Sequence, residues 1–227
     1  MRRDPYAVLR IIQGICPTIV RVLPSPIDDH EFFSNKSKNK IKSFISFEFT
    51  YNNVDLLKER TCKRGKDCTS IDAFVYAVDK EGNHILIAIE WKYTESYKKE
   101  KKADEDVVNE RYKDLASLSY SNLNGWKDEY YYDPLYEFAR QTLLMEQIVH
   151  VQTQSAFLIK ADDYYHVIVR PDDNKEIIGD IQHFKESLKD EGKKRIFEVD
   201  PQAILSPLKG NSKYKELLDY LETRYWK

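Results

Sequence analysis

The sequence predicts a single α/β domain, built on a central mixed β-sheet that is flanked by helices. Three observations lead to this class. Residues 69–95 contain two apolar segments that are joined by a short turn and have the composition of neighbouring strands. Segments with helical spacing lie before and after them. The chain has 227 residues, which is enough for one sizeable core.

The N-terminal third predicts a short helix followed by extended chain. Residues 4–14 have helical spacing, with Pro5 near the first turn and Gly14 near the end. Prolines punctuate residues 17–26, which we expect to be extended or looped. The apolar residues of 41–59 fit a helix, although residues 44–49 taken alone fit a strand equally well. Residues 60–70 predict a basic loop.

The remaining chain alternates between helical and strand patterns. Residues 97–114 carry six positive and six negative side chains, which favours a solvated helix with mixed i,i+4 pairs. An aromatic, turn-rich loop ends at Asp133, where Asp-Pro begins a helix that continues to about residue 151. Residues 154–161 and 164–171 predict strands. Residues 180–190, 194–199 and 212–226 predict a helix, a strand and a last helix.

Composition limits the classes of function. The formal net charge is −2, which excludes a histone-like polycation but leaves open a local basic surface for nucleic acid. No apolar run reaches the roughly 20 residues that span a bilayer, and we expect no signal peptide. Cys16, Cys62 and Cys68 form no disulfide framework or zinc pattern, so we expect a cytoplasmic protein. Walker, G-x-S-x-G and G-x-G motifs are absent from the sequence.

The two central strands carry charges where apolar residues would be expected. The turn after Asp79 suits a three-residue loop with Gly82 in the left-handed conformation. In that register Asp72 faces Glu90 across the ladder, where Cβ atoms lie about 4.5–5.5 Å apart. Two carboxylates at that distance repel each other, and a shared divalent cation would remove the repulsion.

Lys92 lies on the same face as Glu90, two residues further along the strand. Its ammonium could hold a phosphate oxygen or orient an attacking water. A two-residue loop would shift the register by one and split this cluster across the two faces of the sheet. A salt bridge between Lys92 and Asp72 or Glu90, with no further function, explains the hairpin equally well.

Asp72 in one strand and Glu90-Trp91-Lys92 in the next resemble the signature of the PD-(D/E)XK nuclease superfamily, which has the restriction-endonuclease-like fold. Ile71 stands where a proline usually precedes the aspartate. The segments "IEWKYTE" and "LYEFARQTLLMEQ" look closest to a group of bacterial restriction-endonuclease-like proteins. The resemblance covers roughly residues 41–170. It implies a three-layer sandwich, with a core at about 41–170 and a C-terminal extension at 171–227 in a single domain, 1–227.

The resemblance also implies roles for individual residues. Asp72, Glu90 and the carbonyl of Trp91 would bind Mg²⁺ or Mn²⁺, and Lys92 would position or activate water. Glu48 would join the metal site from a helix before the hairpin. A later helix would support the site through Arg140 or Gln141.

By the same resemblance, the expected activity is hydrolysis of DNA phosphodiester bonds. RNA as a substrate and a homodimeric state are left open, and no membrane partner is expected. Phosphate contacts could come from the basic residues on either side of the hairpin, which are Lys63, Arg64, Lys66, Lys98, Lys99, Lys101 and Lys102. The alternative is a non-catalytic nucleic-acid-binding or protein-interaction module on the same fold.

Overall fold

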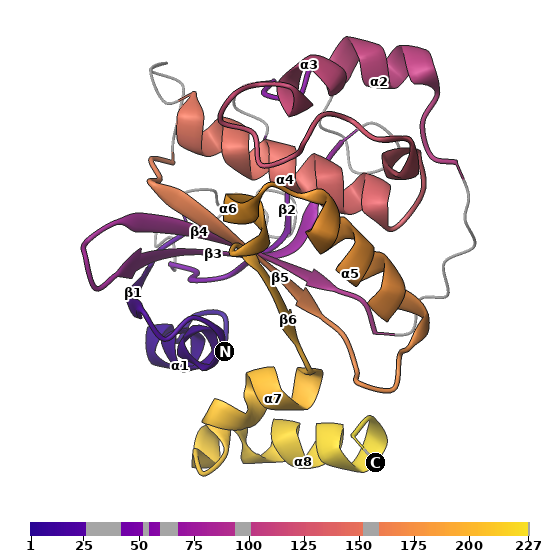
Figure 1. Ribbon diagram of the computed structural model, residues 1–227. Helices are drawn as coiled ribbons and strands as arrows, with labels where there is room; N and C mark the ends of the chain where they lie inside the picture. Colours follow the sequence, from indigo (N-terminus) through magenta and orange to yellow (C-terminus); the bar gives the residue numbers. More distant parts are fainter. Residues whose placement is uncertain (26–41, 52–54, 60–67, 94–100, 152–158, 227) are drawn as a thin grey trace, which may run out of the picture.

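The computed structural model describes residues 1–25, 42–51, 55–59, 68–93, 101–151 and 159–226. A six-stranded mixed sheet forms its centre, in the order β1-β3-β4-β5-β6, with β2 also paired to β3 (Figure 1). The strands are β1 (Ile19–Leu23), β2 (Ser46–Phe49), β3 (Ile71–Asp79), β4 (His84–Trp91), β5 (Asp163–Val169) and β6 (Ile196–Val199). The pairs of β3 are antiparallel, whereas β4, β5 and β6 run parallel.

Helices cover both faces of the sheet and give three layers, as the sequence predicts (Figure 1). One layer contains α2 (Glu105–Arg111), α3 (Lys113–Ala116), α4 (Leu135–His150), α5 (Glu176–Ser187) and α6 (Asp190–Lys193). The other contains α1 (Pro5–Ile15), α7 (Pro201–Leu205) and α8 (Lys215–Arg224). Three short 3₁₀ helices, η1 (Asp128–Tyr131), η2 (Ser206–Leu208) and η3 (Ser212–Tyr214), complete the described elements.

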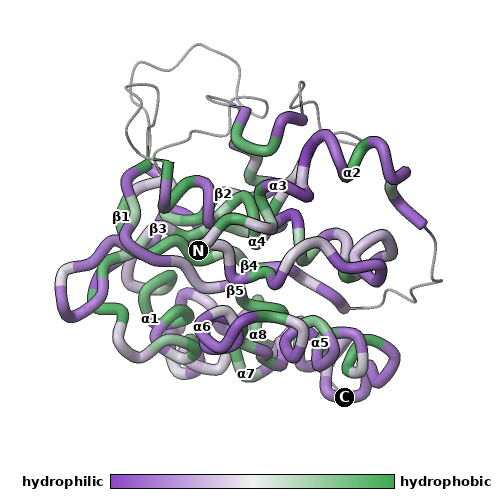
Figure 2. The backbone as a smooth tube through the Cα atoms, turned by 45° about the horizontal axis from the view of Figure 1, so that its top comes forward, coloured by the Kyte–Doolittle hydropathy of each residue, from purple (hydrophilic) through white to green (hydrophobic). Residues whose placement is uncertain are grey.

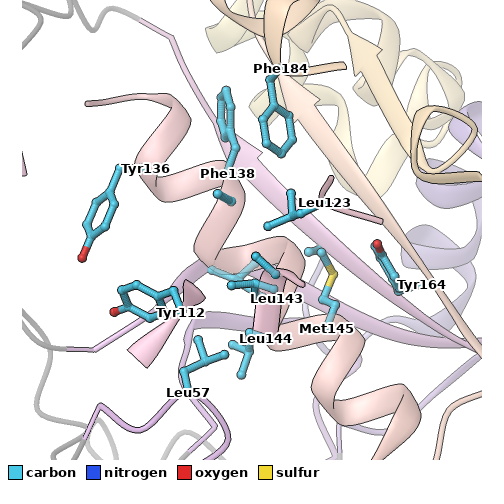
Figure 3. Packing of buried hydrophobic residues seen from close by; sticks show 14 of the residues in the cluster. Leu57, Tyr112, Leu123, Tyr136, Phe138, Leu143, Leu144, Met145, Tyr164 and Phe184 are labelled. Atoms are coloured by element: carbon cyan, nitrogen blue, oxygen red, sulfur yellow. The ribbon is translucent and has the colours of Figure 1, made fainter. Parts of the chain in front are cut away.

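Strand β4 shows why both faces must be covered. Its isoleucines, such as Ile87, pack with α1, α7 and α8, while Leu86 and Ala88 pack with α4 and α5. Hydrophobic segments accordingly gather around the strands, and hydrophilic ones lie mostly in outer turns and on helix surfaces (Figure 2). Figure 3 shows α4 supplying much of one core, with Phe138 and Met145 directed toward neighbouring apolar side chains.

The hairpin register agrees with the prediction. Ala73 pairs with Ile89 and Val78 with His84, which leaves a three-residue loop after Asp79. Gly82 has φ +92°, a conformation that side chains other than glycine rarely adopt. The turn therefore sets which residues oppose each other at the far end of the hairpin.

The helix predicted for residues 41–59 is wrong, because residues 46–49 form strand β2. Phe49 is buried and stacks on Phe74 of β3, with ring centroids 4.1 Å apart. Pairing with β3 therefore outweighs the helical spacing. Of residues 97–114, the described part forms two short helices, α2 and α3, rather than one.

The other predicted helices and strands are present within four residues of their expected ends, apart from those named next. Two predictions fall largely or partly outside the described residues. They are the strand at 154–161, of which residues 152–158 are not described, and the basic loop, of which residues 60–67 are not described. In the described chain no helix is long and apolar enough to cross a membrane.

Candidate active site

Asp72 and Glu90 meet at the end of the β3–β4 hairpin. Ala73 pairs with Ile89 and Phe74 with Ala88, so the same register sets Asp72 opposite Glu90. Asp72 accepts a hydrogen bond from the backbone N–H of Trp91 at 2.8 Å. This hydrogen bond therefore links the side chain of Asp72 to β4, the strand that carries Glu90.

Glu90 and Lys92 are almost fully buried, at 2 % and 3 % exposure. The Nζ atom of Lys92 lies 2.6 Å from Oε1 of Glu90 and 2.5 Å from Oε2 of Glu137, which stands in the first turn of α4. The amide nitrogen of Gln141, one helical turn after Glu137, donates to Oε2 of Glu90 at 2.7 Å and to the carbonyl of Ser70 at 2.9 Å. Helix α4 thus holds both ends of the Glu90–Lys92 pair.

The electrostatics of these groups are dominated by burial. Burial, together with the negative charges of Glu137 and Asp72, raises the pKa of Glu90 to about 8, although Lys92 acts in the opposite direction. Burial alone would lower the pKa of Lys92, but the charges of Glu90 and Glu137 outweigh it and hold that pKa above its ordinary value. Lys92 therefore stays a cation at neutral pH.

We call Asp72, Glu90, Lys92 and Glu137 the acid cluster. Three carboxylates and one ammonium leave it with two negative charges when all four are ionised. Burial also raises the pKa of Glu137, and Asp133 and Asp72 act in the same direction against Lys92. The cluster is therefore short of positive charge in a largely desolvated place.

Glu48 lies on the other side of Asp72 from Glu90. Phe47 pairs with Ala73 and Phe49 with Ile71, so Glu48 occupies the intervening position beside Asp72. It is exposed, and its φ of 51° lies in the left-handed region. The prediction that Glu48 comes from a helix is wrong, because Glu48 belongs to strand β2. Its part in a metal site stays a prediction.

Arg140 and Gln141 are adjacent on α4 but serve different groups. Gln141 contacts Glu90 directly, whereas Arg140 donates to Glu59, with 2.8 Å between Nη2 and Oε1. Glu59 is 4 % exposed and also accepts from the backbone N–H and hydroxyl of Thr69 and from the hydroxyl of Tyr112. The Arg140–Glu59 pair therefore fixes the segment that leads into β3.

A cleft of about 340 Å³ opens beside the acid cluster. Its lining includes Thr69, Ser70, Lys102, Asp133, Glu137 and Arg140. Lys102 forms an ion pair with Asp133 at 3.2 Å, and Lys101 lies over the ring of Tyr131. Of the lysines and arginine expected to contact phosphate, these two are described, while Lys63, Arg64, Lys66, Lys98 and Lys99 lie outside the described residues.

Sequence reasoning missed Glu137 and Glu59. A signal for Glu137 exists, because it lies four residues before Gln141 and helical spacing sets the two on one face of α4. No local pattern marks Glu59, whose partners come from residues 10, 53 and 81 positions away in the chain. The buried pair of Glu59 and Arg140 can therefore be identified only from the folded structure.

The donor chemistry and charge of the acid cluster fit an oxygen-bound divalent cation. Adding two positive charges would neutralise the cluster, and a carboxylate offers about four acceptor positions, so Asp72 and Glu90 can bind a cation beside their present partners. Among the residues described, no three His, Cys, Asp or Glu side chains form a ready metal-binding group. A cation here would therefore rely on two carboxylates supplemented by backbone, water or substrate oxygens, as is usual for Mg²⁺.

The fold and the site define the class of the protein. A mixed sheet between two helical layers, with acids and a lysine at the end of its central hairpin, is consistent with a restriction-endonuclease-like protein. The model of the family REase-ARP, described as "Restriction Endonuclease associating with ARP", matches residues 15–226. The chain belongs to this family, and its membership indicates a nuclease-related role. No curated protein and no solved structure matches the chain.

Proposed function

We propose that this chain is a Mg²⁺- or Mn²⁺-dependent nuclease of the PD-(D/E)XK type that hydrolyses phosphodiester bonds in DNA. The observation that carries the proposal is the buried ion pair between Lys92 and Glu90, held against Glu137 and opposite Asp72. Burying an ammonium and several carboxylates together costs desolvation energy, and such perturbed groups cluster at functional sites. The nuclease-related family supports the same conclusion.

Each residue has a distinct part in the proposed reaction. Asp72 and Glu90 would hold the metal ion, which polarises the scissile phosphate, lowers the pKa of water and stabilises charge on the leaving oxygen. Lys92 remains protonated beside Glu90 and Glu137, so it acts as a hydrogen-bond donor to a phosphate oxygen or to the attacking water. It is therefore not the base that removes a proton.

Helix α4 supplies the support for this arrangement. Gln141 fixes one oxygen of Glu90 and ties it to the carbonyl of Ser70, just before β3. Glu137 fixes the ammonium of Lys92 from the opposite side. We assign Gln141 and Glu137 as positioning residues and Arg140 as a support for the loop before Asp72, while Glu48 would add a carboxylate from β2.

The test is incubation of the chain with plasmid DNA, single-stranded DNA and RNA, with and without Mg²⁺. We expect cleavage of DNA only with Mg²⁺, and loss of cleavage by at least about 100-fold in Asp72→Asn, Glu90→Gln and Lys92→Met. Asp190→Asn, on the exposed side of α6, is the matched control and should cleave as the wild type does. Wild-type cleavage by the Lys92→Met variant would overturn the assignment.

A second candidate is a non-catalytic binding or interaction module. The ion pair of Lys92 and Glu90 is complete without a metal, and the family description includes association with ARP; both observations favour this alternative. Titration with Mg²⁺ separates the two proposals. The nuclease should gain thermal stability as Mg²⁺ binds between Asp72 and Glu90, and Asp72→Asn should abolish the gain, whereas the module should gain none.

A further inference from the structure

An apolar pocket lies on the face of strand β4 that is opposite the acid cluster. Its volume is about 180 Å³, and it is lined by Trp91, Tyr93, Leu205, Leu221, Tyr225 and Trp226, which we call the aromatic pocket. Trp91 stands between Glu90 and Lys92 in the strand, and alternate side chains point to opposite faces. The pocket and the acid cluster are therefore the two sides of one strand end.

The pocket is built by contacts between β4 and the C-terminal helix. The hydroxyl of Tyr93 donates to the backbone carbonyl of Tyr225 at 2.7 Å. The rings of these two residues also meet edge to face, with centroids 5.8 Å apart. The hydrogen bond fixes the backbone of Tyr225, and the edge-to-face contact with Tyr93 positions its ring.

The aromatic faces reach solvent. Trp91 is 38 % exposed and Tyr225 is 46 % exposed, so both residues of the pocket lining are accessible to a ligand. The guanidinium of Arg224 lies over the rings of Tyr220 and Tyr225, at 5.8 and 5.9 Å from their centroids. Exposed rings with an adjacent arginine are the combination that binds single-stranded nucleic acid, since the rings stack on bases and the cation attracts phosphate.

We propose that the aromatic pocket holds an unpaired base of the nucleic acid whose phosphate lies at the acid cluster. The lining offers almost no polar atoms, so recognition would come from stacking and would tolerate any base. A base within a duplex is stacked between its two neighbours and paired with its partner, so it cannot enter such a pocket. The inference rests on the proposed function, which it deepens by naming single-stranded or locally unpaired DNA as the preferred substrate.

The location of Trp91 gives the proposal its geometry. Consecutive Cα atoms of β4 are about 3.8 Å apart. A single strand of nucleic acid that crosses the end of β4 can therefore present a phosphate to the acid cluster and a neighbouring base to the aromatic pocket. The N–H of Trp91 holds Asp72, and its indole lines the pocket. A hydrophobic side chain of a protein partner would also fit an apolar pocket, but it would draw nothing from the arginine beside it.

The experiment measures binding of a labelled oligothymidylate, and of an abasic oligonucleotide of the same length, by fluorescence anisotropy in the presence of EDTA. Tyr225→Leu and Trp226→Leu retain an apolar lining but remove a ring. We expect each to weaken oligothymidylate binding by roughly 5- to 150-fold and to leave abasic binding unchanged. Tyr6→Leu is the matched control, because Tyr6 is an exposed tyrosine on α1 that does not line the pocket, and it should bind as the wild type does.

Each other outcome overturns the inference. Absence of oligothymidylate binding by the wild type, equal binding by all variants, or an equal loss for the abasic oligonucleotide would each show that no base occupies the pocket. The cleavage assay reports separately on the proposed function. If the pocket variants weaken binding but the wild type does not cleave DNA, the nuclease proposal is refuted and the base site is kept. If the wild type cleaves DNA, and Tyr225→Leu and Trp226→Leu change neither binding nor cleavage, the base site alone is refuted.

Discussion

Replacing Lys92 with methionine tests the physical basis of the acid cluster. Methionine has a similar length and is apolar, so the change removes the charge while keeping most of the volume. In the wild type, the ammonium of Lys92 is 2.6 Å from Glu90 and 2.5 Å from Glu137. Without it, these two carboxylates and Asp72 lose the cation that compensates their mutual repulsion.

The magnitude follows from the burial of the partners. Removal of one member of a buried ion pair costs about 3–5 kcal/mol, because the other charge remains desolvated. The side chain of Glu137 is 36 % exposed, and Glu90 can take up a proton, so we expect a cost near the lower limit, about 3 kcal/mol. For a domain of this size, that loss corresponds to a fall in Tm of roughly 6–12 °C.

Thermal and urea denaturation in the absence of divalent metal measure the effect. Lys102→Met is the matched control, because Lys102 pairs with Asp133 but is 40 % exposed, and its loss should cost less than about 1 kcal/mol. The double variant Lys92→Met/Glu90→Gln should regain part of the lost stability, since it also removes the negative charge of Glu90 that Lys92→Met leaves unpaired. If Lys92→Met destabilised the protein no more than Lys102→Met, the cluster would not be the tightly coupled, desolvated group described above.

Three further predictions concern other parts of the fold. Arg140→Met should lower the free energy of unfolding by about 3 kcal/mol in urea denaturation, because it leaves the buried carboxylate of Glu59 without its cationic partner. An unchanged free energy of unfolding would contradict this. Burial, with a smaller effect of Lys92, lowers the pKa of His166 to about 3, so the unfolded chain binds this proton from pH 6.5 downward while the folded chain does not. The wild type should therefore lose up to about 1.4 kcal/mol per pH unit between those values relative to His166→Leu, and parallel pH profiles of the two would refute this. Asp4→Ala should cost about 1 kcal/mol by thermal unfolding, because Asp4 caps α1 and pairs with Lys213, and an unchanged Tm would exclude such a contribution.

The core of the site follows from local sequence signals. The glycine of the turn and the alternation along both strands determine the register, and the register alone brings Asp72 opposite Glu90. The same alternation sets Lys92 on the face of Glu90. These inferences need only the hairpin, whose two strands are neighbours in the sequence.

The surroundings of the site depend on contacts between distant segments. Residues 44–49 fit either helix or strand by spacing, and pairing with β3 decides for the strand. Arg140 and Gln141 are adjacent in the sequence, and the helix directs one to Glu59 and the other to Glu90. Spacing alone cannot assign these partners, because they depend on how α4 is rotated against the sheet.

The end of β4 contributes both to the acid cluster, where we propose that DNA is cleaved, and to the aromatic pocket, where we propose that an unpaired base binds. Three consecutive residues direct their side chains alternately, so Glu90 and Lys92 face α4 while Trp91 faces the C-terminal helix. The backbone of Trp91 also holds Asp72, so a shift of this strand would disturb both faces at once. A substrate base stacked on Trp91 would therefore favour the strand position in which the two acids are opposed. Binding of the base and assembly of the acid cluster would then be coupled, without any contact between the base and the reacting phosphate.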